Sequence, residues 1–326
     1  MRANSAQIPI IDVSDLGGSS ASAALRDVVA DIGRACREVG FFYVKGHGVD
    51  PSLVDAAFAR ARAFFALPVA EKERISIRRS AHNRGYVAMQ GEALDPSKPA
   101  DLKEAFNLGL DLAADDPEVI AGQPFRGVNL WPDQPDFRET MLAYFDAAWL
   151  LGRQLHRAFA LDLGLPVDWF EDKLDRPMAT LRALHYPPRP ASVAQGQLGA
   201  GEHTDYGNVT LLATDGVGGL EVRTRAGDWL AAPSIEGAFV CNIGDCLMRW
   251  TNDVYVSTPH RVNAPGQERY SIAFFLDPNP GAIVAALPTC VSADRPANYP
   301  PIRAADFLRS RLDPTYERAA ATKPQA

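Results

Sequence analysis

The 326-residue chain is poor in several features that mark whole classes of protein. It has only four cysteines, Cys36, Cys241, Cys246 and Cys290, and no Cys-x-x-Cys pair, so the sequence does not indicate a zinc–thiolate or redox site. No hydrophobic run approaches the roughly 20 residues that a membrane-spanning helix needs. The first residues also lack the apolar segment of a secretion signal. We therefore expect a cytoplasmic protein with reduced cysteines.

Positive charge is not concentrated anywhere along the chain. The 33 basic and 40 acidic residues give a formal net charge of −7. Nucleic acids and anionic membranes attract basic surfaces, so neither is an expected partner, and a small-molecule substrate fits better. The sequence is 47% hydrophobic, which is enough for a sizeable core. Since no repeat or Pro/Gly-rich linker divides it, we expect one packed unit, whose oligomeric state stays open.

One short stretch carries residues typical of a metal site. His203 and Asp205 are separated by one residue, and on an extended backbone such side chains point to the same side. His260 follows 57 residues later (260 − 203 = 57), a separation that suits a neighbouring strand of a barrel. Two imidazoles and one carboxylate on one side of a metal leave its other side open, as in non-heme Fe(II) oxygenases. The pattern therefore predicts an iron site.

The residues after His260 predict a β-hairpin. A segment rich in β-branched residues at 254–262 precedes an Asn-Ala-Pro-Gly turn at 263–266, and a second strand is expected at 269–276. If Val262 faces Arg269 across the ladder, antiparallel pairing also places Ser271 opposite the histidine. Arg269 and Ser271 would then share the metal's side of the hairpin. Because a guanidinium grips a carboxylate well, we expect this pair to bind the far end of a short dicarboxylate whose other end is on the iron.

Further motifs accompany these residues along nearly the whole chain. They are Ile-Pro-Ile-Ile-Asp at 8–12, Val-Gly-Phe-Phe-Tyr-Val-Lys-Gly-His-Gly at 39–48, Asn-Leu-Trp-Pro at 129–132, His-Tyr-Pro-Pro at 185–188, Asn-Ile-Gly-Asp at 242–245 and Trp-Thr-Asn at 250–252. Together with the metal and Arg-x-Ser motifs, this order resembles the 2-oxoglutarate and Fe(II)-dependent dioxygenases. The resembling branch includes isopenicillin N synthase, plant flavonoid and gibberellin oxygenases, and aminocyclopropanecarboxylate oxidase.

The resemblance implies a mainly β fold with flanking helices. Its core would be a double-stranded β-helix, a cupin-like jelly roll, preceded by an N-terminal α/β extension, and the short strands counted between 179 and 276 fit this fold. We expect four regions: an N-terminal dioxygenase-type region at 6–122, scaffold helices at 123–176, the Fe(II)/2-oxoglutarate jelly-roll core at 177–280, and a C-terminal segment packed on the barrel at 281–326.

The same resemblance implies a reaction. Fe(II) would be bound by His203, Asp205 and His260, and 2-oxoglutarate and O₂ would be the cosubstrates. An unactivated C–H bond of a small molecule would be oxidised, with release of succinate and CO₂. The sequence does not distinguish hydroxylation from desaturation or ring closure, and it does not identify the substrate.

The strand expected at 179–188 adds candidates for binding the cosubstrate and the substrate. Arg182, Leu184 and Tyr186 share one face of this strand, and His185 points the other way. In the resembling plant enzymes a tyrosine matching Tyr186 binds the 2-oxoglutarate carboxylate together with the Arg-x-Ser pair. An asparagine two residues before that tyrosine helps there, and Leu184 takes its place here. Arg182 could bind an acidic group of the substrate or form a structural salt bridge.

The segment at 81–110 is a second candidate substrate region. It is polar and irregular before it returns to an apolar strand, which is typical either of a binding loop or of a solvated connection. The resemblance places it beside the substrate pocket and adds Arg84 and Tyr86 as substrate candidates. Asn242 and Asp245 are expected to be structural, with Asp245 capping a short helix rather than binding metal.

Three other functions fit part of the pattern. Isopenicillin N synthase and aminocyclopropanecarboxylate oxidase share the Arg-x-Ser pair but work without 2-oxoglutarate, so an Fe(II) oxidase of the same fold is an alternative. A zinc hydrolase would use two histidines and an aspartate but would leave the arginine and serine unexplained. A non-enzymatic barrel that binds an acidic metabolite is the third.

Overall fold

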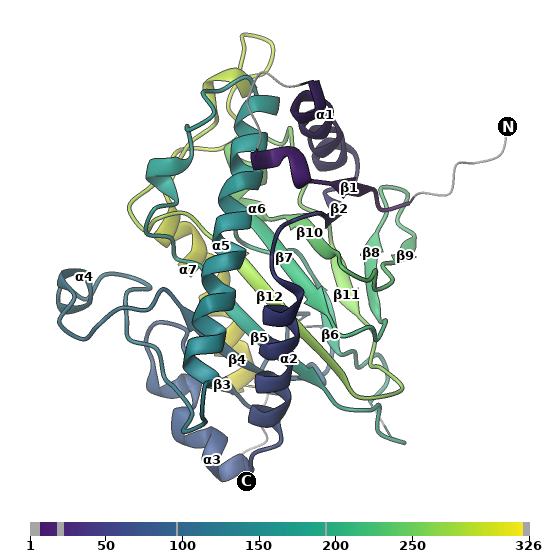
Figure 1. The fold of residues 1–326 in the computed structure, drawn as a ribbon, viewed down its shortest axis with the longest axis vertical. Helices are drawn as coiled ribbons and strands as arrows, with labels where there is room; N and C mark the ends of the chain where they lie inside the picture. Colours follow the sequence, from purple (N-terminus) through teal and green to yellow (C-terminus); the bar gives the residue numbers. More distant parts are fainter. Residues whose placement is uncertain (1–6, 18–22, 96, 193, 322–326) are drawn as a thin grey trace, which may run out of the picture.

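The computed structural model describes residues 7–17, 23–95, 97–192 and 194–321, so residues 6, 18–22, 96, 193 and 322–326 of the predicted regions lie outside it. Its centre is a pair of facing β-sheets flanked by helices (Figure 1). In spatial order the eight-stranded sheet contains β1 Ile10–Asp12, β2 Phe41–Lys45, β10 Phe239–Ile243, β7 Val209–Thr214, β12 Arg269–Leu276, β5 Thr180–Tyr186, β4 Glu104–Gly109 and β3 Gly85–Val87. The four-stranded sheet contains β6 Ala200–His203, β11 His260–Val262, β8 Leu220–Arg223 and β9 Trp229–Ala231. This arrangement is the predicted jelly-roll core.

Helices cover the outer face of the large sheet (Figure 1). The main ones are α1 Ala23–Glu38, α2 Pro51–Phe65 and the long α5 Phe137–Asp162. Helix α2 begins where the sequence indicates, because the Asp50 carboxylate accepts a hydrogen bond from the backbone N–H of Ser52 and Pro51 occupies the first turn. Helix α5 packs through apolar side chains spaced three and four residues apart. These are Phe137, Met141, Tyr144, Phe145, Ala148, Leu151 and Leu155.

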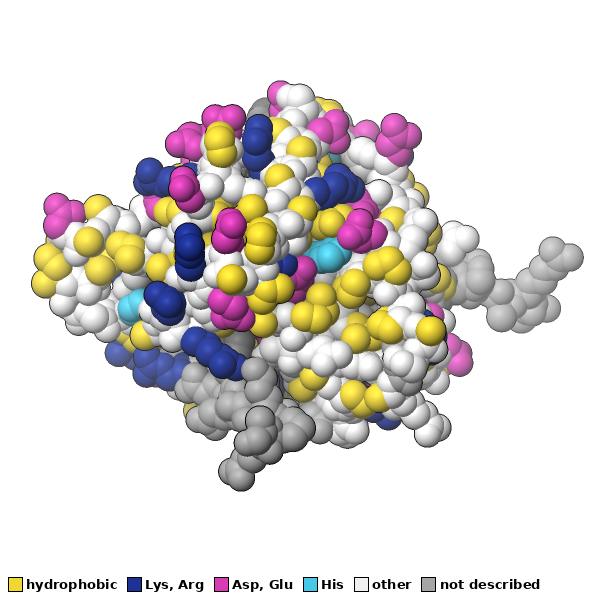
Figure 2. Space-filling view, turned by 90° about the horizontal axis from the view of Figure 1, so that it is seen from below, with side chains coloured by type: hydrophobic (Ala, Val, Ile, Leu, Met, Phe, Trp, Pro, Cys, Tyr) yellow, Lys and Arg dark blue, Asp and Glu magenta, His cyan; other side chains and the backbone are white. Residues whose placement is uncertain are grey.

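Four further α-helices and one small sheet belong to the described chain. They are the helices α3 Val69–Lys72, α4 Pro117–Ile120, α6 Asp245–Trp250 and α7 Ala304–Ala321, and the two-stranded sheet of β13 Ile283–Val284 and β14 Ile302–Arg303. Helix α7 brings Leu308 and Leu312 to the wall of the cavity described below. None of the helices in the described part of the chain combines the length and apolar character needed to cross a bilayer. Figure 2 shows acidic, basic and hydrophobic side chains interspersed on the face seen from below.

Side-chain alternation along the large sheet separates two cores. On β12, Ile272, Phe274 and Leu276 pack against the helices. The alternate residues Arg269, Ser271, Ala273 and Phe275 face the space between the two sheets and line its cavity. This period of two follows from the pleat of a strand. One face of β12 therefore packs in the hydrophobic core, and the other lines the cavity.

The predicted hairpin between β11 and β12 is wrong. Strand β11 pairs with β6 and β8 in the small sheet, whereas β12 pairs with β5 and β7 in the large sheet. The turn at 263–266 therefore carries the chain from one sheet to the other, and Ser271 lies opposite Leu184 and Thr214 instead of His260. Arg269 and Ser271 still approach the histidine's side, because both sheets turn their inner faces to the same space.

Candidate functional site

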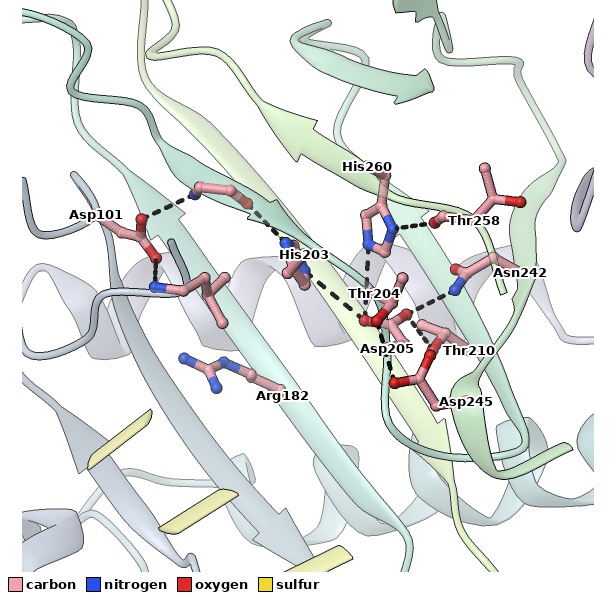
Figure 3. Close-up of polar contacts among 12 residues, drawn as sticks. Asp101, Arg182, His203, Thr204, Asp205, Thr210, Asn242, Asp245, Thr258 and His260 are labelled. Carbon is pink, nitrogen blue, oxygen red and sulfur yellow. Dashed lines mark hydrogen bonds and ion pairs between the residues drawn. The ribbon is translucent and has the colours of Figure 1, made fainter. Parts of the chain in front are cut away.

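Three potential metal ligands meet at the end of the small sheet (Figure 3). His203 is the last residue of β6 and lies opposite His260, the first residue of β11. Asp205 follows in the connection to β7. Its Oδ1 lies 3.8 Å from Nε2 of His203 and 3.6 Å from Nε2 of His260. One ligand atom from each residue lies within 4.8 Å of the others, so a single ion can contact all three.

Backbone carbonyls orient both imidazoles. Nδ1 of His203 lies 2.7 Å from the carbonyl oxygen of Gly201, and Nδ1 of His260 lies 3.1 Å from that of Thr258. A carbonyl only accepts hydrogen bonds, so each Nδ1 carries a proton, and Nε2 of the neutral imidazole is the nitrogen whose lone pair can bind a metal. This is the tautomer that a metal-binding histidine needs.

The Asp205 carboxylate is held by residues of the large sheet (Figure 3). Its Oδ2 accepts hydrogen bonds from Oγ1 of Thr210 at 2.5 Å and from Nδ2 of Asn242 at 2.7 Å. Oδ1 therefore faces the imidazoles. Sequence reasoning treated Asn242 as structural only and did not single out Thr210. Their shared role comes from cross-strand pairing of β10 with β7, in which Asn242 lies opposite Thr210.

The charges of the three residues suit a divalent cation. Burial and the neighbouring His260 lower the pKa of His203 to about 3, so its imidazole is neutral near pH 7. Burial alone would raise the pKa of Asp205, but the two imidazoles and the hydrogen bonds to its carboxylate hold that pKa below its ordinary value. Two imidazole nitrogens and one carboxylate on one side of the ion fit Fe(II) with open positions opposite.

Arg269, Ser271 and Tyr186 lie together on the opposite wall. Arg269 is the cross-strand partner of Tyr186, and its guanidinium carbon lies 4.7 Å from the centre of that ring. Nη1 of Arg269 donates to Oγ of Ser271 at 3.4 Å, and Nε donates to the carbonyl of Val217 at 3.3 Å. The arginine is 1% exposed. A buried guanidinium with a hydroxyl beside it is an arrangement suited to binding a carboxylate.

A cavity of about 150 Å³ joins these two groups of residues. Its walls include the three potential metal ligands, the Arg269 group and Arg182. Further lining residues that the sequence did not single out come from several elements: Phe41, Asn83, Glu92, Lys103, Asn107, Phe125, Tyr206, Phe275 and Asp277. Burial and the charge of Asp205 raise the pKa of the Asp277 carboxyl to about 7. These residues are scattered between positions 41 and 277, so only the folded chain reveals that they belong to one wall.

The structure does not support substrate contact by Arg84 or Tyr86. Neither lines the cavity. Tyr86 packs into the helix-side core and its hydroxyl donates to Oε2 of Glu104 at 2.6 Å. The buried Arg84 guanidinium lies directly over Gly109 and donates to the carbonyl of Asn83 at 3.3 Å. The polar groups of both side chains therefore bind other parts of the protein around β3 and β4.

Asp245 is not part of the group of potential metal ligands, as expected. Its capping role differs from the prediction, because Gly244 is the N-cap of α6 and Asp245 is the first helical residue. The carboxylate of Asp245 instead accepts hydrogen bonds from Thr204 at 3.2 Å and from Arg311 at 2.7 Å. It thus ties the metal-site connection to α7.

Comparison with known proteins decides the family. Residues 8–134 match the model described as the non-haem dioxygenase in morphine synthesis N-terminal domain, and residues 177–278 match the 2OG-Fe(II) oxygenase superfamily. The 2-oxoglutarate-Fe(II) type oxidoreductase hxnY of Emericella nidulans is 37% identical over 324 residues, covering 97% of this chain and 93% of that protein. The chain belongs to the 2-oxoglutarate/Fe(II)-dependent dioxygenases. It lies in their isopenicillin N synthase-like branch.

Solved structures of similar proteins support this family assignment. A full-length Neurospora crassa protein, solved in complex with alpha-KG (2-oxoglutarate) and 5-formyluracil, has a TM-score of 0.81 and 34% identity, with 94% of this chain and 96% of that chain covered. JOX2 in complex with 2OG, Fe and JA has a TM-score of 0.78 and 31% identity, with 97% and 89% covered. The relatives' names and bound cosubstrate favour the 2-oxoglutarate-dependent enzyme over an oxidase of the same fold.

Proposed function

We propose that His203, Asp205 and His260 are the iron ligands of this dioxygenase. The observation that carries the proposal is that one cavity is lined both by this group and by the buried Arg269. The imidazoles present Nε2 to a common point, and Asp205 keeps one oxygen directed there while the other is engaged by Thr210. Such fixed orientation is what a metal site requires of its protein ligands.

We further infer that the far carboxylate of 2-oxoglutarate binds Arg269, Ser271 and Tyr186. The guanidinium and the hydroxyl donate hydrogen bonds to this carboxylate. Because Arg269 is almost fully buried, water screens its charge little and its attraction for the carboxylate is strong. Leu184 lies opposite Ser271 where the resembling plant enzymes carry asparagine. Arginine, serine and tyrosine therefore supply the polar contacts at this end of the cavity.

Bound Fe(II), 2-oxoglutarate and O₂ together supply the oxidation, in which the keto acid becomes succinate and CO₂ and the substrate loses a C–H bond. The residues of this chain fix where that oxidation occurs. Thr210 and Asn242 hold the Asp205 carboxylate, and Phe275 and Leu308 form apolar walls that limit the access of water. A water-poor site protects a reactive oxidant from side reactions.

The substrate is proposed to be a small molecule, because the remaining space is a pocket with apolar and polar walls. Relatives of the same fold support this proposal. The Neurospora crassa relative has been solved with thymine and with 5-formyluracil, and JOX2 with JA.

An anaerobic titration tests these assignments. The metal-free protein is titrated with Fe(II) and then with 2-oxoglutarate, and the visible charge-transfer band of the chelated keto acid is recorded. We expect a saturable band, no iron binding in Asp205→Ala, and 2-oxoglutarate affinity reduced about 30-fold or more in Arg269→Ala, because losing one partner of a buried charge pair costs at least about 2 kcal/mol.

Arg261→Ala is the matched control. Arg261 lies on β11, but it does not line the cavity and its side chain donates to Glu221 at 2.7 Å. Its loss is expected to leave the 2-oxoglutarate titration unchanged. Iron binding without a band at any 2-oxoglutarate concentration, or equal effects of the two arginine substitutions, would contradict the proposal.

A further inference from the structure

The cavity has a second polar region on β4 and β5, apart from the metal ligands and the Arg269 group. Asn107 lies opposite Arg182 across these strands, and Arg182 lies opposite Ala273 on β12. All three residues line the cavity. The next inward-facing pair along the ladder between β7 and β12 is Thr210 with Phe275, and Thr210 holds Asp205. A molecule bound at Asn107 therefore lies about 7 Å from Thr210 along the strand direction. The distance between the strands adds to this separation.

Asn107 presents a hydrogen-bond acceptor that the described residues leave unused. Its side chain is 0% exposed, and its Nδ2 donates to Oδ1 of Asn83 at 3.1 Å. Its Oδ1 has no hydrogen-bond partner among the described residues. Buried polar atoms nearly always have a partner, and one that lines a ligand cavity can obtain it from the ligand. The missing partner is an N–H or O–H donor.

The charges beside Asn107 are already balanced. Nη2 of Arg182 donates to Oε2 of Glu92 at 2.5 Å, and the same carboxylate oxygen lies 3.6 Å from Nζ of Lys103. Lys103 in turn donates to Asp101 at 2.9 Å. Two cations and two carboxylates give this buried cluster a net charge of zero (2 − 2 = 0). A substrate carboxylate would find no unbalanced cation here and would bear the full cost of leaving water.

The rest of the cavity also disfavours an anionic substrate. Arg269 is assigned to the cosubstrate, and Asp277, directly after the end of β12, adds an acidic group to the cavity wall. Uncharged polar groups do not carry this penalty, since a hydrogen bond with Asn107 or the Arg182 guanidinium compensates their desolvation. Aromatic side chains of Phe275, Tyr206 and Phe125 line the same space and offer flat apolar surfaces to a ring.

We propose that the substrate of this dioxygenase is a compact, uncharged cyclic amide, of the lactam or imide class, whose N–H donates to Oδ1 of Asn107 and whose carbonyl accepts from Arg182. This inference rests on the proposed function, because it places the oxidised carbon next to the metal site. A guanidinium has five N–H donors, so Arg182 can contact a carbonyl while it retains Glu92.

Matched pairs of probes test the assignment by calorimetry. Uracil and benzamide carry the N–H and carbonyl, 1,3-dimethyluracil lacks the donor, and benzoate replaces the amide by a carboxylate. Each is titrated into the metal-free protein and, without O₂, into the protein loaded with Fe(II) and 2-oxoglutarate. We expect uracil and benzamide to bind at least about tenfold more tightly than dimethyluracil and benzoate, the ratio for the loss of one buried hydrogen bond.

Two substitutions at one position separate recognition from folding. Asn107→Leu removes the acceptor and is expected to weaken amide binding about tenfold or more, while the uncharged Asn107→Gln keeps an amide oxygen and is expected to weaken it less. Both are expected to leave the charge-transfer titration with 2-oxoglutarate unchanged, which establishes that they fold.

The assignment is overturned if benzoate binds as tightly as benzamide, if dimethyluracil matches uracil, if Asn107→Leu binds the amides normally, or if no amide binds. A missing charge-transfer band with amide binding intact would contradict only the proposed function.

Discussion

Each iron-ligand candidate is oriented by a contact that leaves one atom for the metal. Gly201 and Thr258 engage Nδ1 of the two histidines, and Thr210 and Asn242 engage one oxygen of Asp205. Flexible side chains would lose conformational entropy on binding an ion, and these contacts remove that freedom beforehand. The supporting residues should therefore influence metal affinity without touching the metal.

Thr210→Val tests this at the smallest possible change, because it removes a hydroxyl and keeps the shape of the side chain. We expect Fe(II) affinity to fall about 10- to 100-fold, as for other residues that support a metal ligand. The measurement is competition with a chelator under anaerobic conditions. Thr214→Val is the control on the same strand, since Thr214 bonds to Ser234 and does not line the cavity. Equal losses in both variants would contradict a specific role for Thr210.

Local spacing predicted the residues of the site that lie close together in the sequence. The separation of two places Arg269 with Ser271 on one face, because alternation is a local property of a strand. It also keeps Asp205 close to His203, although β6 ends at His203 and Asp205 lies in the connection that follows. Thr210 and Asn107 escaped notice, since a single threonine or asparagine in a strand has no distinctive pattern. Their roles depend on which strands become neighbours, and that is decided by the packing of the whole chain.

Strand existence was also easier to predict than strand pairing. Residues 269–276 form a strand as expected, yet the strand joins the large sheet rather than returning along β11. Turn residues indicate that the chain reverses, but a reversal within one sheet and a crossing between two sheets use the same residues. The substrate candidates Arg84 and Tyr86 are absent from the cavity lining for a related reason, because the packing of β3 and its flanking residues decides where they point.

The junction of β10 with α6 is tightly packed against the metal-site connection. A Cβ on Gly244 would lie 2.2 Å from the carbonyl oxygen of Gly207, two residues after Asp205. We expect Gly244→Ala to lower the free energy of unfolding by about 1–3 kcal/mol and to weaken Fe(II) binding, since backbone must move. Urea denaturation and chelator competition measure the two effects. Gly281→Ala, where a Cβ meets nothing within 4 Å, should change neither; a loss there as large as at Gly244 would contradict the steric explanation.

Helix α5 contains a buried histidine away from the metal. His156 contacts the carbonyl of Gly152 and Nδ2 of Asn208, and burial lowers its pKa to about 4. The unfolded chain takes up a proton below about pH 6.5, whereas the folded chain does not until about pH 4. Its contribution to stability is therefore complete above pH 6.5 and is lost as the pH falls toward 4, at up to roughly 1.4 kcal/mol per pH unit.

His156→Gln keeps hydrogen-bonding groups and removes the titration. We expect the metal-free variant to lose less stability than the parent protein between pH 6.5 and 4, as measured by urea denaturation at several pH values. Identical pH profiles would show that His156 is already protonated or solvated in the folded protein.

At the scale of the whole molecule, the two cores share one sheet. The helix-side core and the inter-sheet core lie on opposite faces of the same strands, including β2, β5 and β12. If one core unfolded, the shared strands would separate and the apolar side chains of the other core would also be exposed to water. Unfolding of one core alone is therefore unfavourable. The four regions expected from the sequence stay a prediction about boundaries, and the shared strands connect the first region with the third.

We expect the metal-free protein to unfold in a single calorimetric transition. Fe(II) with 2-oxoglutarate, each at about 100 times its dissociation constant, should raise the midpoint, because one ligand at that excess adds about 2.7 kcal/mol to the free energy of unfolding. A chelator should return the midpoint to the metal-free value. Two separate transitions, or ligands that stabilise only one of them, would contradict the coupling of the cores.

The crossing between β11 and β12 has a consequence for how this protein can change length during evolution. In a hairpin, inserting one residue in the turn shifts the register and reverses every following side chain. Here no ladder joins the two strands, and Arg269 takes its register from β5 and β7. Segment 263–268 can therefore gain or lose residues while the arginine keeps facing the cavity. Homologous enzymes can differ in the length of this loop without losing the function of the residues on either side.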